Sequence, residues 1–247
     1  MFFAEQEIDV SGENLAGITL TLQPGVTVSG RIVFEGKNST PPPDLRQTRV
    51  LLTPANQNRP TMGLAPAQID EAGNFVLQGV PPGQYRFGTT MLAVVAGSGW
   101  TLKSATAAGR DVLDAPIEIK PGGNIEGVTL TFTDLVTELS GTLTDGAGKP
   151  ISDLSILVFT TDRSLWGSLG RRIRQPTQPS SDGKFRITGL PPGDYYLGVV
   201  TDVEPGEWTD AAFLDQLAAA AIKVTLGEGE KKVQDIKLKG TMEIVMW

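Results

Sequence analysis

Few side chains in this sequence could carry out chemistry. The chain contains no histidine and no cysteine, which excludes Ser-His-Asp and Cys-His catalytic arrangements and the usual ligand sets of zinc and copper. A pair of carboxylates is the remaining option for acid–base catalysis. The densest acidic stretch, from Asp202 to Asp210, holds Glu204 and Glu207 beside Trp208. Such a composition is compatible with a glycosidase pair next to an aromatic sugar platform.

We favour a structural explanation for these acidic residues, because the stretch leads into a predicted helix and carboxylates stabilise helix N-termini. Asp145, Asp162 and Asp182 could hold a hard cation, but their spacing is not that of an EF-hand, and turn formation is the explanation we favour. The glycines at 122–123 and 227–229 lie in predicted hairpin turns with no helix behind them, so they form no phosphate loop. The sequence therefore predicts no catalytic residue, no metal and no cofactor.

The best candidate for a binding site is the loop 161–176, which gathers basic residues in a chain of net charge −7. Its candidate side chains for a ligand or partner are Arg163, Trp166, Arg171, Arg172 and Arg174. An indole face flanked by guanidinium groups can stack on a sugar and hold an acidic glycan, or it can anchor a protein partner. In the alternative, Trp166 covers a sheet edge and the arginines are solvated or paired with acids. We favour this alternative because large aromatic side chains are more often packed.

The elements that position this loop form two similar units. The segment Gly79-Val80-Pro81-Pro82-Gly83-Gln84-Tyr85 recurs as Gly189-Leu190-Pro191-Pro192-Gly193-Asp194-Tyr195. The proline followed by glycine predicts a type II turn that joins two strands as a hairpin in each copy. The two glycines of the turn are 193 − 83 = 110 residues apart, and Gly30 and Gly141 in two Ser-Gly strands are 141 − 30 = 111 residues apart. This near-equality indicates a duplication, and the repeated tyrosine predicts a buried ring with its hydroxyl on backbone.

Alternating apolar residues predict the remaining strands. They cover 26–34, 50–53, 75–78, 85–87, 100–103, 117–119 and 128–132 in the first unit, and 139–144, 156–160, 185–188, 195–199, 222–224 and 233–238 in the second. The last two strands of each unit are predicted to pair as a closing hairpin. A short helix is predicted near 210–219, because Thr209 or Asp210 can cap it and Phe213, Leu214 and Leu217 share one face.

A similar closing pair, 8–10 and 18–22, opens the sequence with no unit before it. We therefore expect residues 1–23 to be the last hairpin of a preceding, truncated repeat, followed by sandwiches at 24–134 and 135–240 and a tail at 241–247. The predicted fold class is all-β: two tandem antiparallel Greek-key β-sandwiches of about seven strands each, with one short helix.

The order of these motifs resembles the carboxypeptidase regulatory-like domain. In the first unit the resemblance lies in Val28-Ser29-Gly30-Arg31-Ile32, Asp70-Glu71-Ala72-Gly73-Asn74-Phe75 and the Pro-Pro-Gly segment, and the second unit repeats it up to about residue 239. The resemblance implies a transthyretin-like sandwich, related in shape to starch-binding and collagen-adhesin B-type repeats. It also implies a non-catalytic accessory of secreted or cell-envelope bacterial proteins.

The leading functional prediction is a non-catalytic structural or interaction module, a spacer or accessory, with a protein or polysaccharide partner. A carbohydrate-binding module using Trp166 and the arginines is the alternative, and an enzyme comes third. The acidic charge argues against nucleic acid, and no apolar run suits membrane insertion. The first residues lack signal-peptide features, so a secreted or cell-envelope location rests on the resemblance, and the oligomeric state is open. No Lys–Asn crosslink is expected, because 26–34 holds no lysine and 233–238 no asparagine.

Overall fold

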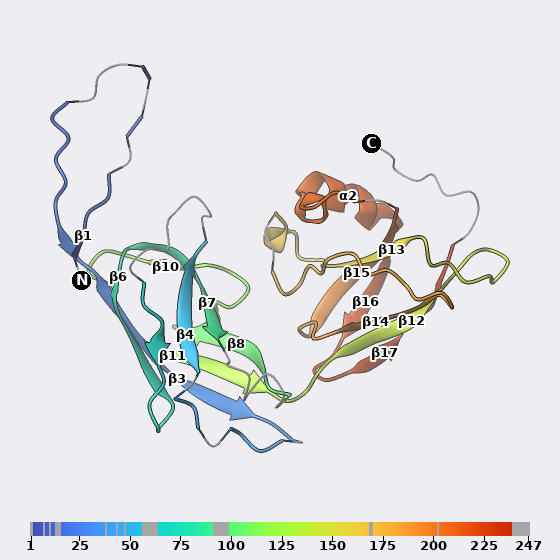
Figure 1. Ribbon diagram of the computed structural model, residues 1–247, viewed down its shortest axis with the longest axis horizontal. Helices are drawn as coiled ribbons and strands as arrows, with labels where there is room; N and C mark the ends of the chain where they lie inside the picture. The colour runs from blue at the N-terminus through green and yellow to red at the C-terminus, as the bar shows by residue number, and fades with distance from the viewer. Residues whose placement is uncertain are drawn as a thin grey trace. The chain divides into compact units, whose positions relative to one another are not determined.

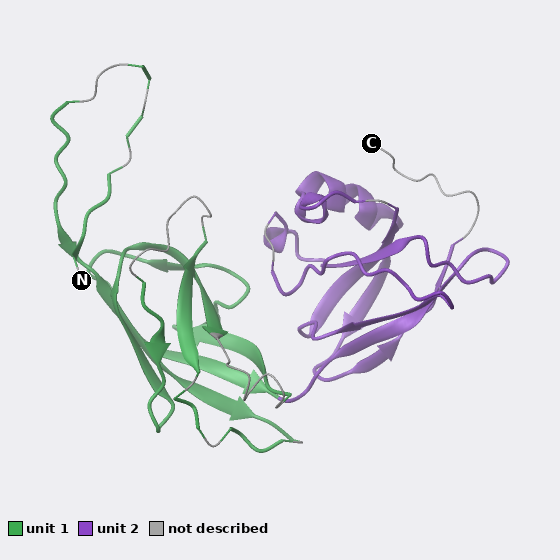
Figure 2. Cartoon of the chain, in the orientation of Figure 1, with its two compact units in different colours: residues 1–133 green, residues 134–247 purple. Residues whose placement is uncertain are grey.

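The computed structural model describes residues 2–6, 8–9, 11–12, 16–37, 39–42, 44–46, 48–55, 64–90, 99–167, 170–201 and 203–238. The chain divides into two compact units, Met1–Thr133 and Asp134–Trp247 (Figure 2). Strands make up most of the regular secondary structure in both units, as Figure 1 shows, and the all-β prediction is confirmed.

Unit 1 folds as two sheets around one apolar core. Its main strands are β3 (Val26–Glu35), β4 (Arg49–Pro54), β5 (Ala67–Gln68), β6 (Asn74–Val80), β7 (Gly83–Thr90), β8 (Thr101–Ala107), β9 (Arg110–Asp111), β10 (Ile117–Ile119) and β11 (Ile125–Thr133). One sheet has the order β10-β7-β4-β5 and the other β6-β3-β11-β8-β9. Alternate side chains of both sheets face the core, where Val28, Val50 and Leu130 are fully buried.

Unit 2 repeats the two-sheet plan and adds helices. Its strands are β12 (Glu138–Thr144), β13 (Ser155–Thr160), β14 (Lys184–Thr188), β15 (Gly193–Val200), β16 (Ile222–Leu226), β17 (Lys231–Val233) and β18 (Ile236–Lys237); its helices are the 3-10 turns η1 (Arg163–Leu165) and η2 (Glu207–Thr209) and the α-helix α2 (Ala211–Ala220). One sheet has the order β14-β12-β17, with β18 also paired to β12, and the other β13-β15-β16.

The predicted helix is confirmed as α2, and Asp210 is its cap. The Asp210 carboxylate accepts a hydrogen bond from the Phe213 N–H at 2.9 Å. Leu214, on the inner face of this helix, is fully buried. A Cβ added at Gly198 of β15 would lie 2.7 Å from Cγ of Leu217. The glycine therefore lets the helix approach the sheet closely.

The first and last strands of each unit pair in parallel, so the prediction of purely antiparallel sandwiches is wrong at this position. In unit 1, β3 and β11 are joined over the register Val28–Ile125 to Glu35–Thr133. In unit 2, β12 pairs in parallel with both β17 and β18. The strands between the two partners are divided between both sheets, so the last strand returns beside the first one in the same direction. Sequence alternation reports burial and not strand direction.

A glycine sits where these two strands approach each other. A Cβ at Gly30 would overlap the Val128 carbonyl oxygen and lie 2.8 Å from Cζ of Phe75, its cross-strand partner on β6. Unit 2 repeats this arrangement: Gly141 lies against the Gln234 carbonyl, with Cζ of Phe185 2.9 Å from a Cβ built there. The duplicated Ser-Gly and aromatic motifs therefore encode one packing solution twice.

The Pro-Pro-Gly segments connect the two sheets instead of forming hairpins. In unit 1, β6 pairs with β3 whereas β7 pairs with β4 and β10. Gly83 and Gly193 have φ angles of 153° and 150°, far above the roughly +80° of a type II turn. The hairpin and the turn type were both wrongly predicted, since a sheet-to-sheet connection has the same alternation and turn residues as a hairpin.

The predicted closing hairpins are also wrong. Strand β10 pairs with β7, whereas β11 pairs with β3 and β8. Likewise β16 pairs with β15, whereas β17 pairs with β12. Gly122 and Gly229, with φ of 68° and 64°, turn the chain from one sheet to the other. The predicted strand 233–238 is split into β17 and β18, where the Asp235 carboxylate accepts a hydrogen bond from the Thr142 N–H at 2.8 Å.

The first residues differ from the predicted hairpin as well. Strand β1 (Phe2–Phe3) pairs with β2 (Gln23–Pro24), and residues 16–22 belong to no strand. Figure 1 shows the described residues between β1 and β2 extending away from the sheets of unit 1. Val10 and the tail 241–247 lie outside the described residues. The repeat boundaries at 1–23, 24–134 and 135–240 stay a prediction.

We predict that Gly30→Ala and Gly141→Ala each destabilise their unit by about 2–3 kcal/mol, because the new methyl group meets a backbone carbonyl that cannot move without breaking the parallel ladder. Chemical unfolding measures this loss. Gly146→Ala is the matched control, since its Cβ would lie 3.6 Å from the nearest atom, the Leu238 carbonyl oxygen. Equal stability of all three variants would contradict the close-approach argument.

Candidate functional site

The candidate loop of unit 2 starts directly after β13 and is shaped by its own polar residues. The Asp162 carboxylate accepts a hydrogen bond from the Ser164 N–H at 3.0 Å and thereby caps η1. The Gly167 N–H donates to the Thr209 carbonyl at 2.8 Å, which ties the loop to η2. Arg163 forms an ion pair with Asp215 of α2. The first half of the loop is therefore fixed to the helical segment.

Trp166 turns inward from this loop. Its indole N–H donates to the Thr160 carbonyl at 2.8 Å, and its ring meets Phe159 edge-on with centroids 5.7 Å apart. The Arg163 guanidinium lies 5.5 Å from the centroid of the Trp166 ring. The side chain is partly buried against a second apolar cluster of unit 2, the outer cluster, which includes Phe159 and Leu214. This geometry agrees with the packed alternative of the sequence analysis.

The second half of the loop runs beside β13. Ile173 is buried and bridges to Phe159, and the Arg174 N–H donates to the Val158 carbonyl at 3.0 Å. Arg172 donates to the Pro192 carbonyl at 2.9 Å and to the Tyr195 hydroxyl at 3.3 Å.

Arg174 and Tyr195 make further contacts with the ends of the Pro-Pro-Gly connection. The Arg174 guanidinium donates to the carbonyls of Thr188 and Gly189 at 3.0 and 2.9 Å. The Tyr195 ring is fully buried and its hydroxyl donates to the Pro191 carbonyl at 2.6 Å, which confirms the predicted role of this tyrosine. Arg172 and Arg174 therefore hydrogen-bond to backbone carbonyls at both ends of the connection.

The five candidate residues do not converge on one site. Arg163 pairs with Asp215 of α2 and packs on the Trp166 ring. Arg172 and Arg174 instead donate hydrogen bonds to carbonyls of the Pro-Pro-Gly connection. Arg171 lies between the two groups in the sequence and is partly buried.

Together the loop and α2 cover the outer face of the sheet β13-β15-β16. The outer cluster consists of buried Leu157, Phe159, Ile173, Val200 and Leu214, with Trp166, Tyr196, Val203, Trp208, Phe213, Leu217 and Ala218 packed against it. Five consecutive residues of β13 are buried, whereas the burial of β4 in unit 1 alternates. A strand buried on both faces has this continuous pattern. The loop thus builds a second apolar layer.

A shallow pocket of about 450 Å³ lies between the second half of the loop and the free side of β14. Its lining comprises Gly170, Ile173, Arg174, Gln175, Thr177, Arg186, Ile187 and Thr188. The Arg186 guanidinium is largely exposed and contacts the Glu138 carboxylate at 2.6 Å. Arg186 was not predicted from the sequence, because it lies on β14, outside the candidate loop, and only the packing of that strand brings it to the pocket. Two guanidinium groups make this pocket suited to an anionic group.

The aspartates considered as cation ligands serve separate turns. Asp145 accepts hydrogen bonds from the N–H groups of Ala147 and Lys149, both at 2.8 Å, whereas Asp162 caps η1. The Lys184 ammonium, followed by the Ser180 hydroxyl, holds the pKa of the Asp182 carboxyl well below its usual range. No group of three or more acidic residues suited to a metal ion occurs among the described residues.

The acidic stretch before α2 is likewise part of the local fold. The Glu207 carboxylate accepts a hydrogen bond from the Glu204 N–H at 3.1 Å, and Asp210 caps the helix. Trp208 packs on the outer cluster. Asp202 lies outside the described residues. Each of these interactions stabilises the turn into α2.

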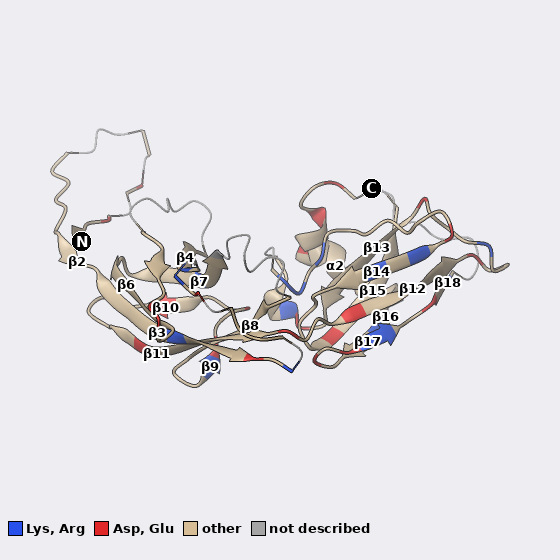
Figure 3. Ribbon diagram, turned by 60° about the horizontal axis from the view of Figure 1, so that its bottom comes forward, with Lys and Arg blue, Asp and Glu red and all other residues tan. Residues whose placement is uncertain are grey.

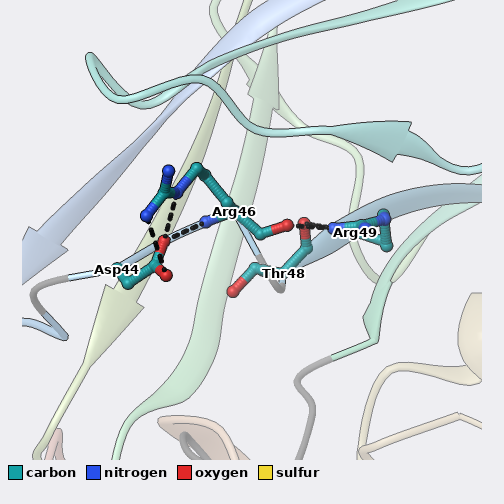
Figure 4. A network of polar contacts seen from close by, with 4 residues as sticks. All are labelled: Asp44, Arg46, Thr48 and Arg49. Atoms are coloured by element: carbon teal, nitrogen blue, oxygen red, sulfur yellow. Dashed lines mark hydrogen bonds and ion pairs between the residues drawn. The ribbon is translucent and has the colours of Figure 1, made fainter.

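Unit 1 has an exposed charge network at the entrance to β4 that the sequence analysis did not anticipate (Figure 4). The Asp44 carboxylate accepts from the Arg46 side chain and backbone N–H, each at 3.0 Å. The same guanidinium holds the pKa of the Asp44 carboxyl below its usual range. Arg49 donates to the carbonyls of Arg46 and Thr48. These contacts order the chain before β4.

Charged residues of both signs are interleaved along the strands (Figure 3). None of the helices in the described ranges is long and apolar enough to cross a membrane; the longest, α2, has ten residues.

No protein-family model matches this sequence, and no curated protein matches it. Among solved structures, the chain is similar to the minor pilin GBS52 of Streptococcus agalactiae, with 14% identity, TM-score 0.36 and coverage of 90% of this chain and 100% of the pilin. A streptococcal ancillary pilin has 14% identity and a TM-score of 0.36, and the match covers 91% of this chain and 65% of the pilin. The TIE protein of Bacillus anthracis has 14% identity and a TM-score of 0.27, and the match covers 90% of this chain and 35% of that protein. The chain thus spans less than two thirds of the last two structures. Likenesses of this size leave its function to be inferred from its own residues.

We predict that Trp166→Ala lowers the free energy of unfolding of unit 2 by about 2–3 kcal/mol, because it removes a partly buried ring from the outer layer. Chemical unfolding monitored by circular dichroism gives this value. Gln175→Ala, an exposed position in the same loop, is the control and should change stability by less than about 0.5 kcal/mol. An unchanged stability of the Trp166 variant would mean that the ring is not part of the core.

Proposed function

We propose that this chain is a non-catalytic structural module: tandem β-sandwich repeats that act as a tension-bearing spacer in a secreted or cell-envelope bacterial protein. The carboxypeptidase regulatory-like resemblance of its motifs supports the location. The proposal rests mainly on one observation, the parallel pairing of the first and last strands of each unit.

Parallel terminal strands place the entry and exit of each unit at opposite ends of one hydrogen-bonded ladder. In unit 1 the chain enters at Val26 and leaves at Thr133, and the ladder between β3 and β11 joins them. A pulling force along the chain then acts along the strands and loads the inter-strand bonds together. A hairpin opened from its end would break the same bonds one after another. This geometry suits a spacer under tension.

Side chains reinforce the ladder in both units. The Asn124 side-chain oxygen accepts a hydrogen bond from the Thr27 N–H at 2.9 Å, which joins the approach to β11 to the start of β3. In unit 2 the Asp235 carboxylate accepts from the Thr142 N–H at 2.8 Å. Each bond links a first strand to the segment that closes the same unit.

We predict that Asn124→Ala lowers the force at which unit 1 unfolds, measured by single-molecule stretching of the full chain. Asp70→Ala is the matched control, because it removes a carboxylate that accepts backbone bonds from Ala72 and Asn74, outside the terminal ladder. Each loss costs about 1 kcal/mol in thermal or chemical stability. Only the Asn124 variant should lose mechanical resistance. If both variants unfold at the same force as the wild type, the ladder does not bear the load.

A second candidate function, binding of an acidic saccharide, is favoured by the pocket beside Arg174 and Arg186. A uronate carboxylate entering this pocket would compete with Glu138 for the Arg186 guanidinium. Guanidinium groups bind carboxylates through paired, charge-assisted hydrogen bonds. Trp166 has no part in this candidate, because its ring packs in the outer layer.

We predict that, if this pocket binds saccharides, Arg186→Gln weakens binding of a galacturonic acid hexamer at least fivefold in calorimetric titration. Lys184→Gln is the control, because Lys184 is exposed on the same strand but does not line the pocket. A neutral glucose hexamer should not bind. Equal binding of the acidic hexamer by wild type and both variants would exclude the pocket.

A further inference from the structure

Residues 12–22, which precede the two sheets of unit 1, resemble the segment that forms β11, the closing strand of that unit. Residues 12–22 read Gly-Glu-Asn-Leu-Ala-Gly-Ile-Thr-Leu-Thr-Leu, and residues 122–132 read Gly-Gly-Asn-Ile-Glu-Gly-Val-Thr-Leu-Thr-Phe. Six of these eleven positions are identical: Gly12, Asn14, Gly17, Thr19, Leu20 and Thr21 match residues 110 positions later. The same spacing separates Phe75 from Phe185 and Tyr85 from Tyr195. Residues 12–22 are therefore in phase with the duplication.

The two copies also share a backbone feature. Gly127 has φ of 69° and lies at the register shift between Ile125 and Val128, where β11 begins its regular pairing with β3. Gly17, its counterpart, has φ of 75°. A left-handed glycine directly before an alternating run marks the start of the closing strand.

Burial separates the two copies. Val128, Leu130 and Phe132 of β11 are each 0% exposed, whereas Ile18, Leu20 and Leu22 are 48%, 57% and 68% exposed. Strand β11 is central in its sheet, between β3 and β8. A sandwich that lacks this strand has a gap between two others and an open core. The exposed apolar side chains of 18–22 have the alternation that fills such a gap.

We infer that residues 12–22 supply the closing strand of another β-sandwich of the same kind, whose other strands lie upstream of residue 12 in the natural polypeptide. The strand pairs in parallel with the counterpart of β3 in that sandwich and antiparallel with the counterpart of β8, as β11 does in unit 1. A second copy of this chain is a poorer partner, because β3 of unit 1 already has β6 and β11 on its two sides. The inference holds whether or not the module bears tension.

Hydrogen exchange tests this assignment in two polypeptides: the present chain and the natural polypeptide that includes about 90 further residues upstream. We expect amides of 18–22 to exchange without protection in the present chain and to be protected at least a thousandfold in the longer one. Persistent fast exchange in the longer polypeptide would overturn the inference. A natural polypeptide without a preceding sandwich would overturn it as well, as would protection in the present chain that depends on its concentration.

A pair of variants distinguishes a docked strand from a linker. Leu20→Asp should lower the melting temperature of the preceding sandwich by at least 10 °C and leave unit 1 unchanged, because Leu20 corresponds to fully buried Leu130. Thr19→Asp is the matched control, since its counterpart Thr129 is only partly buried on the opposite face. Equal effects of the two variants would show that 18–22 has no buried face.

Discussion

The close approach of the first and last strands at Gly30 and Gly141 is the constraint on which each unit depends. A side chain at either position would displace the neighbouring carbonyl and the phenylalanine that covers the glycine. With glycine present, the aromatic ring of the next strand fills the space and seals the core beside the parallel ladder. In this sheet the first strand lies between the phenylalanine strand and the closing strand, and all three pack closely because the first strand has a glycine at the contact. Because the last strand of each unit pairs with the first, this contact links the two ends of the unit's sequence.

The two units share this plan and differ in whether the second sheet, which contains β4 or β13, is covered on its outer face. In unit 1 the strand β4 keeps alternating burial, whereas β13 in unit 2 is buried on both faces. The loop 161–176 and α2 provide the additional layer, and Gly198 gives the helix room to approach. Arg172 and Arg174 donate to carbonyls at the sheet-to-sheet connection, and Arg163 pairs with Asp215 of α2, so these three arginines help to fix a long covering loop. A cluster of arginine and tryptophan in an acidic chain is therefore compatible with a purely structural role.

Local chemistry made most strands and the helix predictable. Alternating burial located β3, β4, β6, β7, β14 and β15 to within a few residues, and Asp210 before a short apolar face identified α2. The sheet to which each strand belongs was not predictable, because Pro82-Gly83 is equally compatible with a hairpin and with a connection between sheets. The packed position of Trp166 agrees with the alternative favoured from the sequence, because the large ring is stabilised more by contact with Phe159 and a hydrogen bond to the Thr160 carbonyl than by exposure to solvent. Arg186 could not be found from sequence, because its pocket depends on the packing of β14 beside the loop.

The covalent connection between units follows from the same closure. Strand β11 ends at Thr133 and β12 begins at Glu138, so four residues separate the closing strand of one unit from the first strand of the next. The last of them, Thr137, is buried and its carbonyl accepts a hydrogen bond from the Gly189 N–H at 2.9 Å. The connector is therefore part of the hydrogen bonding of unit 2 and not a free linker. A force that leaves one ladder at Thr133 enters the next after four residues, and little chain is available to extend before the second ladder is loaded. Short connectors between parallel terminal strands are what a repeat needs if each unit is to resist stretching in series.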